Sequence, residues 1–149
     1  MPLKYVSRAA TFQYPDNWTI EQQNSPSGGR SVTVHSPSGA FWSVAIYSQP
    51  ADPAELARAA VEAMKQEYPG LDFEAADETV AGRDLVGFDM NFFCLDLTNT
   101  AAVRCLRNEG TSYAIFYQAE DHDFAELGEV FQAITTSLIR ELRHLRYER

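Results

Sequence analysis

Three patterns in the sequence predict an α+β fold, in which an antiparallel β-sheet of about six to eight strands is flanked by two main helices. Residues 84–117 are densely apolar and alternate in part at strand spacing. Residues 52–68 and 124–145 carry apolar residues at helical spacing, so each is expected to bury one side. The predicted architecture is therefore an α/β/α sandwich. The length of 149 residues predicts one domain, residues 1–149.

The first third of the chain indicates a meander of short strands joined by tight turns. Tyr14-Pro15-Asp16-Asn17-Trp18 has turn chemistry, because proline presets φ and Asp and Asn tolerate the remaining geometry. The tetrapeptide Ser-Pro-Ser-Gly occurs at 25–28 and again at 36–39, and it suits a hairpin connection. We favour turns over a phosphate site, since consecutive hairpin turns lie at opposite ends of a sheet. The predicted strands are 10–14, 18–22, 31–35 and 41–48.

Capping residues mark both helices. Asp52 is placed to cap a helix that begins at Pro53, and Pro69-Gly70 ends it. The alanine-rich apolar side of this helix predicts close packing on a sheet. Asp121 or Asp123 is expected to cap the closing helix, which runs to about Leu145. Between the helices, residues 71–81 predict an edge strand that is partly protected by acidic residues.

The central hairpin is expected to turn about Asn99-Thr100, between a strand at 84–97 and its return at 102–109. A third strand follows at 113–117. In this register Cys94 and Cys105 face each other, and a disulfide between them in an oxidising compartment stays an open alternative. We favour two free thiols that act as small core residues.

Phe93, Leu95 and Leu97 are the candidate interaction residues. Phe88, Met90 and Phe92 place apolar groups on one side of the strand, and these three place them on the other side. A sheet that is apolar on both faces must be covered on both. The helix at 52–68 is the only remaining cover for the second side, and it is short. We therefore predict an open apolar face for dimerisation or partner capture; the alternative is that these residues are plain core.

Composition narrows the class of partner. The net charge of −9 argues against nucleic acid and against an anionic membrane surface. No stretch has the length of a transmembrane helix, so we expect no membrane insertion. Residues 1–12 have no apolar signal region, which predicts a cytoplasmic protein with reduced thiols. A chain trimmed of its signal would remove that inference.

No catalytic motif, cofactor-binding motif or metal-ligand spacing stands out. The three histidines, His35, His122 and His144, are scattered through the chain. Glu120-Asp121-His122-Asp123 offers oxygen and imidazole ligands, so cation binding there stays open, although helix capping is the favoured role. We therefore assign no catalytic residue, no cofactor and no metal ligand, and we expect that the protein is not an enzyme.

The segment Phe12-x-Tyr14-Pro15-x-x-Trp18, together with the order of strands and helices along nearly the whole chain, resembles the PsbP-like superfamily. This group includes the photosystem II oxygen-evolving subunit, the Ran-binding Mog proteins and bacterial single-domain relatives. The resemblance implies an antiparallel sheet with helices on both faces, with Tyr14 and Trp18 as core anchors. It also implies a non-enzymatic binding or assembly module. Some bacterial relatives are dimeric chaperones that hold apolar helices of type VI secretion effectors, and no motif here selects that branch.

Two functional hypotheses follow from these patterns. The first is a protein-interaction or assembly module, adaptor- or chaperone-like, with an unknown protein partner or a second copy of itself. The alternative is a small-ligand-binding domain or an enzyme with a pocket between sheet and helix. An apolar sheet surface open to solvent would favour the first hypothesis, and a buried polar cluster lining a cleft would favour the second.

Overall fold

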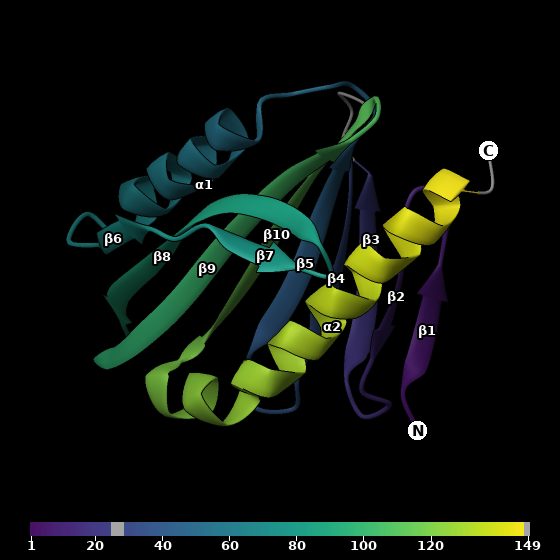
Figure 1. Ribbon diagram of the computed structural model, residues 1–149. Helices are drawn as coiled ribbons and strands as arrows, with labels where there is room; N and C mark the ends of the chain where they lie inside the picture. Colours follow the sequence, from purple (N-terminus) through teal and green to yellow (C-terminus); the bar gives the residue numbers. More distant parts are fainter. Residues whose placement is uncertain (25–28, 148–149) are drawn as a thin grey trace.

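The computed structural model describes residues 1–24 and 29–147, and for residues 143–147 it describes the helical backbone alone. It confirms the predicted α+β class, with a broad antiparallel sheet between two helices (Figure 1). The strands are β1 (Leu3–Val6), β2 (Thr11–Tyr14), β3 (Thr19–Asn24), β4 (Arg30–His35), β5 (Phe41–Tyr47), β6 (Asp72–Ala75), β7 (Glu78–Val80), β8 (Arg83–Cys94), β9 (Leu97–Asn108) and β10 (Thr111–Glu120). The helices are α1 (Pro53–Glu67) and α2 (Asp121–Tyr147).

The main sheet has eight strands within the described residues. Its order is β3-β4-β5-β10-β9-β8-β6, and β7 pairs with the beginning of β8. All of the pairings are antiparallel. β1 and β2 form a separate two-stranded hairpin. The long strands β8, β9 and β10 therefore lie in the middle of the fold, as the density of apolar residues predicted.

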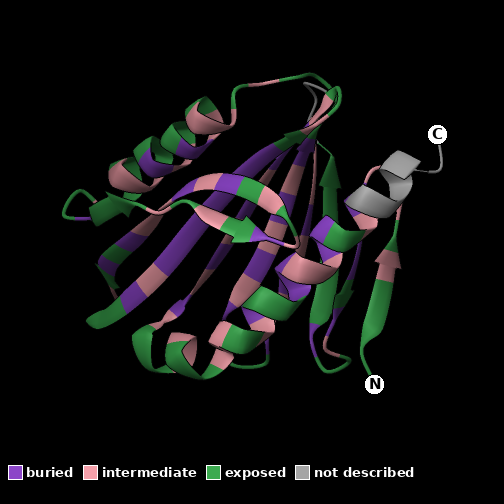
Figure 2. Ribbon diagram, in the orientation of Figure 1, coloured by how far each residue is buried: buried purple, intermediate pink, exposed green. Residues whose placement is uncertain are grey.

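One face of the sheet is covered by α2 together with the β1–β2 hairpin. α2 runs diagonally across the strands, and buried residues line its inner side (Figure 2). Trp42 is fully buried here: its ring lies 4.9 Å from that of Phe12, and its Nε1 donates to Thr135 Oγ1 at 2.9 Å. Trp18 is also buried, 6.1 Å from the ring of Phe131. The expected anchoring role of Trp18 thus has its structural basis.

The other face is covered by α1 at one end of the sheet. The predicted cap is confirmed, since Asp52 Oδ1 accepts from the backbone N–H of Ala54 at 3.1 Å and Pro53 begins the helix. Ala57 and Val61 are buried in a cluster that α1 forms with β8 and β9. Small side chains on the helix allow this close approach. In the described part of the chain, neither helix is long and apolar enough to cross a membrane.

The central hairpin turns earlier than predicted. β8 ends at Cys94, the turn is Leu95-Asp96, and Phe93 pairs with Thr98. The expected turn at Asn99-Thr100 is wrong, because Leu95 and Asp96 both adopt positive φ, 53° and 65°, in a two-residue connection. Positive φ at both positions is the geometry of a tight hairpin turn whose twist matches the strands, and Asn-Gly normally signals it.

Three smaller predictions also need correction. The single strand expected over residues 71–81 is two strands, β6 and β7, although β6 is the expected sheet edge. Glu120, rather than Asp121 or Asp123, caps α2: its Oε2 accepts from the backbone N–H of His122. β1 was not expected. The Ser36–Gly39 turn is confirmed by Gly39 at φ 97° and a backbone hydrogen bond from Ser36 to Ala40, whereas residues 25–28 lie outside the described residues.

Candidate functional site

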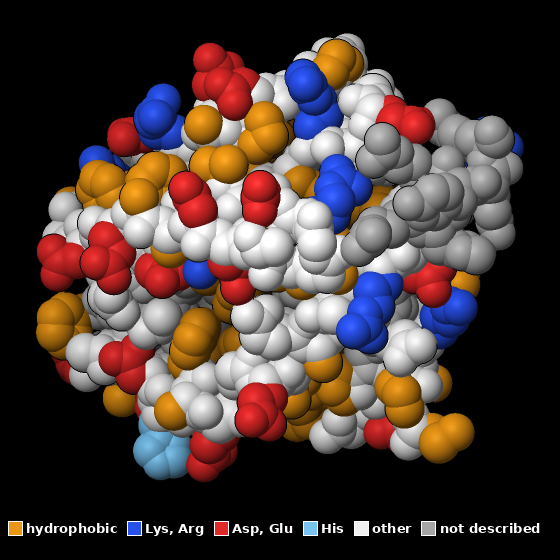
Figure 3. All heavy atoms as spheres, viewed as in Figure 1, with side chains coloured by type: hydrophobic (Ala, Val, Ile, Leu, Met, Phe, Trp, Pro, Cys, Tyr) orange, Lys and Arg blue, Asp and Glu red, His pale blue; other side chains and the backbone are white. Residues whose placement is uncertain are grey.

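The tip of the β8–β9 hairpin gathers the three predicted interaction residues. Phe93 is 73% exposed, Leu95 91% and Leu97 54%. They stand at the end of the hairpin, and the space-filling view shows apolar side chains at this left-hand edge with acidic side chains nearby (Figure 3). We call Phe93, Leu95 and Leu97 the hairpin tip. Large exposed apolar groups gathered at one place are typical of contact surfaces.

The sequence suggested that the three residues share one face of the sheet, but the structure shows that they do not. Phe93 lies opposite Thr98, whereas Leu97 lies opposite Cys94 on the other side of the ladder, and Leu95 occupies the turn. The expectation that α1 partly covers the Phe93 side is wrong. α1 packs on the Met90 and Phe92 side, where the rings of Tyr68 and Phe92 are 4.3 Å apart. The hairpin tip therefore presents apolar groups on both sides of the ladder and at the turn.

The turn itself holds Leu95 in an unfavourable conformation. A branched side chain at φ 53° is an uncommon choice where Gly or Asn costs less. Backbone strain of this kind, about 1–3 kcal/mol, tends to accumulate at functional sites. Leu95 is both strained in its backbone and almost fully exposed in its side chain. Neither the local conformation nor burial therefore accounts for a leucine at this position.

A second accessible surface lies on the α1 side of the sheet, at the end that α1 does not reach. We call the α1-side surface of β3, β4 and β5 the open face. Opposed residues across the ladders place His35 beside Phe41, and Thr33 beside Ser43. The rings of Phe41 and Phe116 stack at 6.0 Å. Its β4 and β5 residues, none of them buried, are Ser31, Thr33, His35, Phe41, Ser43, Ala45 and Tyr47.

A buried ionic cluster lies on the α2 side of the sheet. Arg104 is only 7% exposed, and its guanidinium donates to Glu78 Oε1 at 2.9 Å and to Asp89 Oδ1 at 2.7 Å. It also donates to the backbone oxygens of Phe88 and Val103. Gln132 of α2 donates to the other oxygen of Glu78 at 3.0 Å. The cluster therefore ties β7 to the sheet and to α2.

The electrostatics of this cluster favour a structural role. Burial alone lowers the pKa of Arg104, but the hydrogen bond to Asp89 and the nearby negative charges raise it above the usual arginine value. Burial raises the pKa of Tyr117, the neighbouring titratable group, to about 12. Neither Arg104 nor Tyr117 changes charge near neutral pH. Sequence reasoning missed the cluster, although a lone arginine in the apolar run Ala101–Leu106 signalled a need for buried partners.

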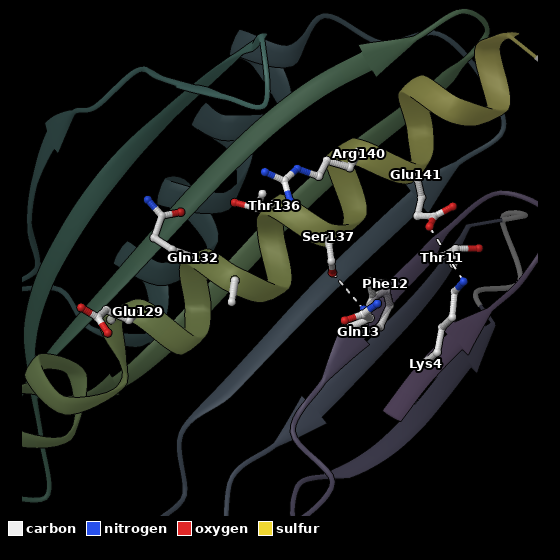
Figure 4. Close-up of a pocket in the computed structure, with 12 residues that line it drawn as sticks. Lys4, Thr11, Phe12, Gln13, Glu129, Gln132, Thr136, Ser137, Arg140 and Glu141 are labelled. Carbon is white, nitrogen blue, oxygen red and sulfur yellow. Dashed lines mark hydrogen bonds and ion pairs between the residues drawn. The ribbon is translucent and has the colours of Figure 1, made fainter. Parts of the chain in front are cut away.

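A surface pocket of about 590 Å³ lies between β2 and the outer side of α2 (Figure 4). Most of the residues that line it have polar side chains, but several of these groups bind one another. Ser137 Oγ accepts from the backbone N–H of Gln13 at 2.9 Å, and Lys4 Nζ lies 3.9 Å from Glu141 Oε1. The pocket borders the N-terminal hairpin, so it differs from the expected pocket between the sheet and a helix. Its lining includes Gln132, which binds Glu78, but it does not include Arg104, Glu78 or Asp89.

The acidic segment at the start of α2 is occupied by structural contacts. Glu120 caps the helix, Asp121 Oδ1 accepts from Thr100 Oγ1 at 2.7 Å, and Asp123 Oδ2 accepts from Ser38 Oγ. Among the described residues, no group of three or more His, Cys, Asp or Glu side chains is placed to hold a metal ion. These contacts anchor the beginning of α2 to β9 and to the Ser36–Gly39 turn.

The two cysteines are free and far apart. Cys94 pairs with Leu97 and Cys105 pairs with Val86, so the expected juxtaposition is wrong. Cys105 lies eight residues beyond Leu97 on β9, roughly 26 Å at about 3.3 Å per residue. The cause is the early turn at Leu95-Asp96. A disulfide between them would require a different hairpin register.

No protein-family profile matches the sequence, and no curated protein matches it either. Solved structures do resemble it. The solution structure of the cyanobacterial PsbP protein CyanoP from Synechocystis sp. PCC 6803 aligns with a TM-score of 0.64 at 14% identity, over 91% of this chain and 90% of that one. The Pseudomonas aeruginosa protein of unknown function PA94 aligns with a TM-score of 0.54 at 14% identity, over 92% of this chain and 95% of that one.

A crystal structure from Bacteroides thetaiotaomicron VPI-5482 aligns with a TM-score of 0.61 at 11% identity, over 91% of this chain and 47% of that one. At such identities the likeness establishes the fold and leaves activity open. The order of strands and helices and these alignments agree with the resemblance that the sequence suggested. The chain has the PsbP-like fold.

Proposed function

We propose that this protein is a non-enzymatic, single-domain interaction or assembly module, adaptor- or chaperone-like, that contacts a protein partner through the hairpin tip. The observation that carries the proposal is the exposure of Phe93, Leu95 and Leu97 together at the end of one hairpin. An aromatic residue and two leucines provide the apolar contact that interface centres use. A homodimer is also proposed, and the open face offers an additional surface outside the hairpin tip.

Two further observations support the proposal. Leu95 keeps a strained turn conformation while its side chain is nearly fully exposed, which suits a residue retained for contact rather than for folding. The long ladder between β8 and β9 holds the tip rigidly, because antiparallel hydrogen bonds continue up to the turn. A rigid apolar tip loses little conformational entropy on binding.

The non-enzymatic part of the proposal is supported by the state of the titratable groups. Where pKa values shift strongly in the described residues, they move away from neutrality. A hydrogen bond to Cys94 and partial burial raise the pKa of Tyr68 to about 12, and burial raises that of Cys105 to about 12. Catalytic acids and bases are instead tuned toward the working pH. The two free cysteines support a reducing compartment, and we propose a cytoplasmic location.

A small-ligand function remains the second candidate, because the 590 Å³ pocket beside α2 has the volume of a small-molecule site. Its walls hold both signs of charge, from Lys4, Arg140, Glu129 and Glu141. This candidate is tested by adding a fragment library to the protein in solution and recording the NMR chemical shifts of the Gln13 and Ser137 amides. Saturable shifts there, with none at the hairpin tip, would favour this second candidate.

The main proposal is tested by comparing proteins captured from the native host. The double variant Phe93→Ser/Leu95→Ser removes the apolar tip, and Leu3→Ser/Val6→Ser is the matched control at exposed apolar residues of β1. We expect a partner that is retained by the wild type and the control and is lost with the tip variant, while circular dichroism stays unchanged. Equal retention by all three proteins would contradict the proposal.

A further inference from the structure

The two edges of the main sheet differ in their protection. β6 forms one edge: it has four residues, includes Asp72 and Glu74, and its Phe73 ring lies 4.2 Å from Lys65 Nζ of α1. β3 forms the other edge, with six residues that are all exposed. Natural sheets protect their edges with short strands, charges or proline, since free backbone N–H and C=O groups accept another strand. β6 follows this rule and β3 departs from it.

β3 has the features of a strand that pairs again. Among the described residues its backbone pairs with β4 on one side only. The β1–β2 hairpin belongs to a separate sheet, and its Tyr5 reaches β3 through a side-chain hydrogen bond to Gln22. Its sequence, Thr-Ile-Glu-Gln-Gln-Asn, contains no proline and one charged residue. That residue, Glu21, already has a partner, because its Oε1 lies 2.7 Å from His35 Nε2 on the neighbouring strand.

We propose that β3 is the interface with a second copy of this chain, in which two β3 strands pair antiparallel and join two sheets into one. Closed dimers use a two-fold axis, so the same patch of both copies must fit itself. For identical edges side by side, that axis runs perpendicular to the sheet. A rotation about this axis does not exchange the two faces of the sheet, so each residue of β3 points to the same face in both copies. Because side chains alternate along a strand, two residues that lie opposite each other must both be odd-numbered or both be even-numbered.

Charge then selects the register. Two centred registers pair five residues of each strand, one about Glu21 and one about Gln22. The first places Glu21 directly opposite Glu21 of the partner, and like charges in that position destabilise a ladder. The second places Gln22 opposite Gln22 of the partner, and Glu21 opposite the partner's Gln23. The pairing is therefore centred on Gln22.

This geometry has a consequence for the open face. Because the axis is perpendicular to the sheet, the open faces of both copies lie on the same side and become continuous across the new ladder. Phe41 and Phe116 of each copy then border one wide surface. The hairpin tip lies toward the β6 edge, at the opposite end of the strand order. The interface is therefore independent of the proposed contact through Phe93, Leu95 and Leu97.

A charge-pair experiment tests the interface and its register. We expect the wild type to be a dimer by light scattering after size exclusion. Gln22→Lys and Gln22→Glu should each give a monomer, because two equal charges face each other at the centre. An equimolar mixture of the two variants should restore the dimer, since unlike charges then meet. Tyr5 Oη donates to Gln22 Oε1 at 3.1 Å; a glutamate can still accept this bond, so loss of the dimer in both variants indicates charge repulsion.

Gln66→Lys and Gln66→Glu are the matched controls, since Gln66 is an exposed glutamine on α1. The Gln66 variants should leave the dimer intact. All variants should keep the melting temperature of the wild type once the dependence of that temperature on protein concentration is taken into account. A monomeric wild type would overturn the proposal, as would variants at Gln22 that remain dimeric or a mixture that stays monomeric. Capture of a partner through the hairpin tip would be unaffected by any of these results.

Discussion

The two faces of the main sheet differ although the same strands form both. On β5 the alternation is complete: Trp42, Val44 and Ile46 are buried under α2 and the β1–β2 hairpin, whereas Phe41 and Tyr47 on the other side remain accessible. Trp42, Phe12 and Phe131, which are among the largest fully buried side chains of the described residues, all lie on the covered face. The α1 side has a compact cluster at the β8–β9 end and the open face at the β3–β5 end.

The difference shows that the alternation of side chains along a strand assigns each residue to one of two faces. It does not indicate which face is covered by a helix. Phe41 and Trp42 are adjacent aromatic residues with opposite environments. Coverage depends on how far α1 and α2 extend across the sheet, and α1 is much the shorter helix. Aromatic residues on the open face are thus available for contact, while those on the covered face maintain the fold.

The largest expected effect is on the covered face. Trp18→Ala removes a ring that is buried against Phe131, and it should lower the free energy of unfolding by about 3–5 kcal/mol, as large-to-small core changes do. Chemical denaturation followed by circular dichroism measures the change. An unfolding curve like that of the wild type would mean that this face is less tightly packed than its burial indicates.

A second prediction concerns the close approach of β8 and β9. A Cβ at Gly87 would clash with the backbone carbonyl oxygen of Val103, so Gly87→Ala should cost about 1–3 kcal/mol. Gly128→Ala is the control, because a Cβ there meets no atom within 4 Å and α2 should gain about 0.5–1 kcal/mol from the better helix former. Equal changes in the free energy of unfolding at both positions would show that the backbones of β8 and β9 can move apart at little cost.

A third prediction tests the open face directly. Phe41→Ala should reduce stability by no more than about 1.5 kcal/mol, because the ring is partly solvated in the native protein and stacks mainly on Phe116. The comparison with Trp18→Ala, measured by the same denaturation, gives the contrast between the faces. If Phe41→Ala were as costly as Trp18→Ala, the open face would be a true core surface.

The smallest effect is chemical and concerns the two thiols. Cys105 is buried, and burial raises its pKa to about 12, so at mildly alkaline pH it stays a neutral thiol and unreactive. Cys94 is partly exposed and should react. A thiol reagent should therefore detect one cysteine in the native protein and two in denaturant. Detection of no thiol in denaturant would instead indicate an oxidised protein.

Features encoded by neighbouring residues were predictable from the sequence. Asp52-Pro53 and Pro69-Gly70 bracket α1, the helical spacing of apolar residues predicted α2, and Met90 and Phe92 share a face as their alternation required. These signals are local, because capping, turn chemistry and amphipathic period each depend on residues a few positions apart. The fold class followed from them.

The place of the candidate interaction residues was predictable in part. Phe93, Leu95 and Leu97 were selected for their apolar character and they are exposed, while their role in binding stays a prediction. Their arrangement was not, because the turn at Leu95-Asp96 uses positive φ without glycine or asparagine and so carries no turn signal. The tertiary structure alone decided the hairpin register, the separation of Cys94 from Cys105 and the partners of Arg104. Each of these depends on contacts between residues distant in the chain, which only the packed sheet and helices bring together.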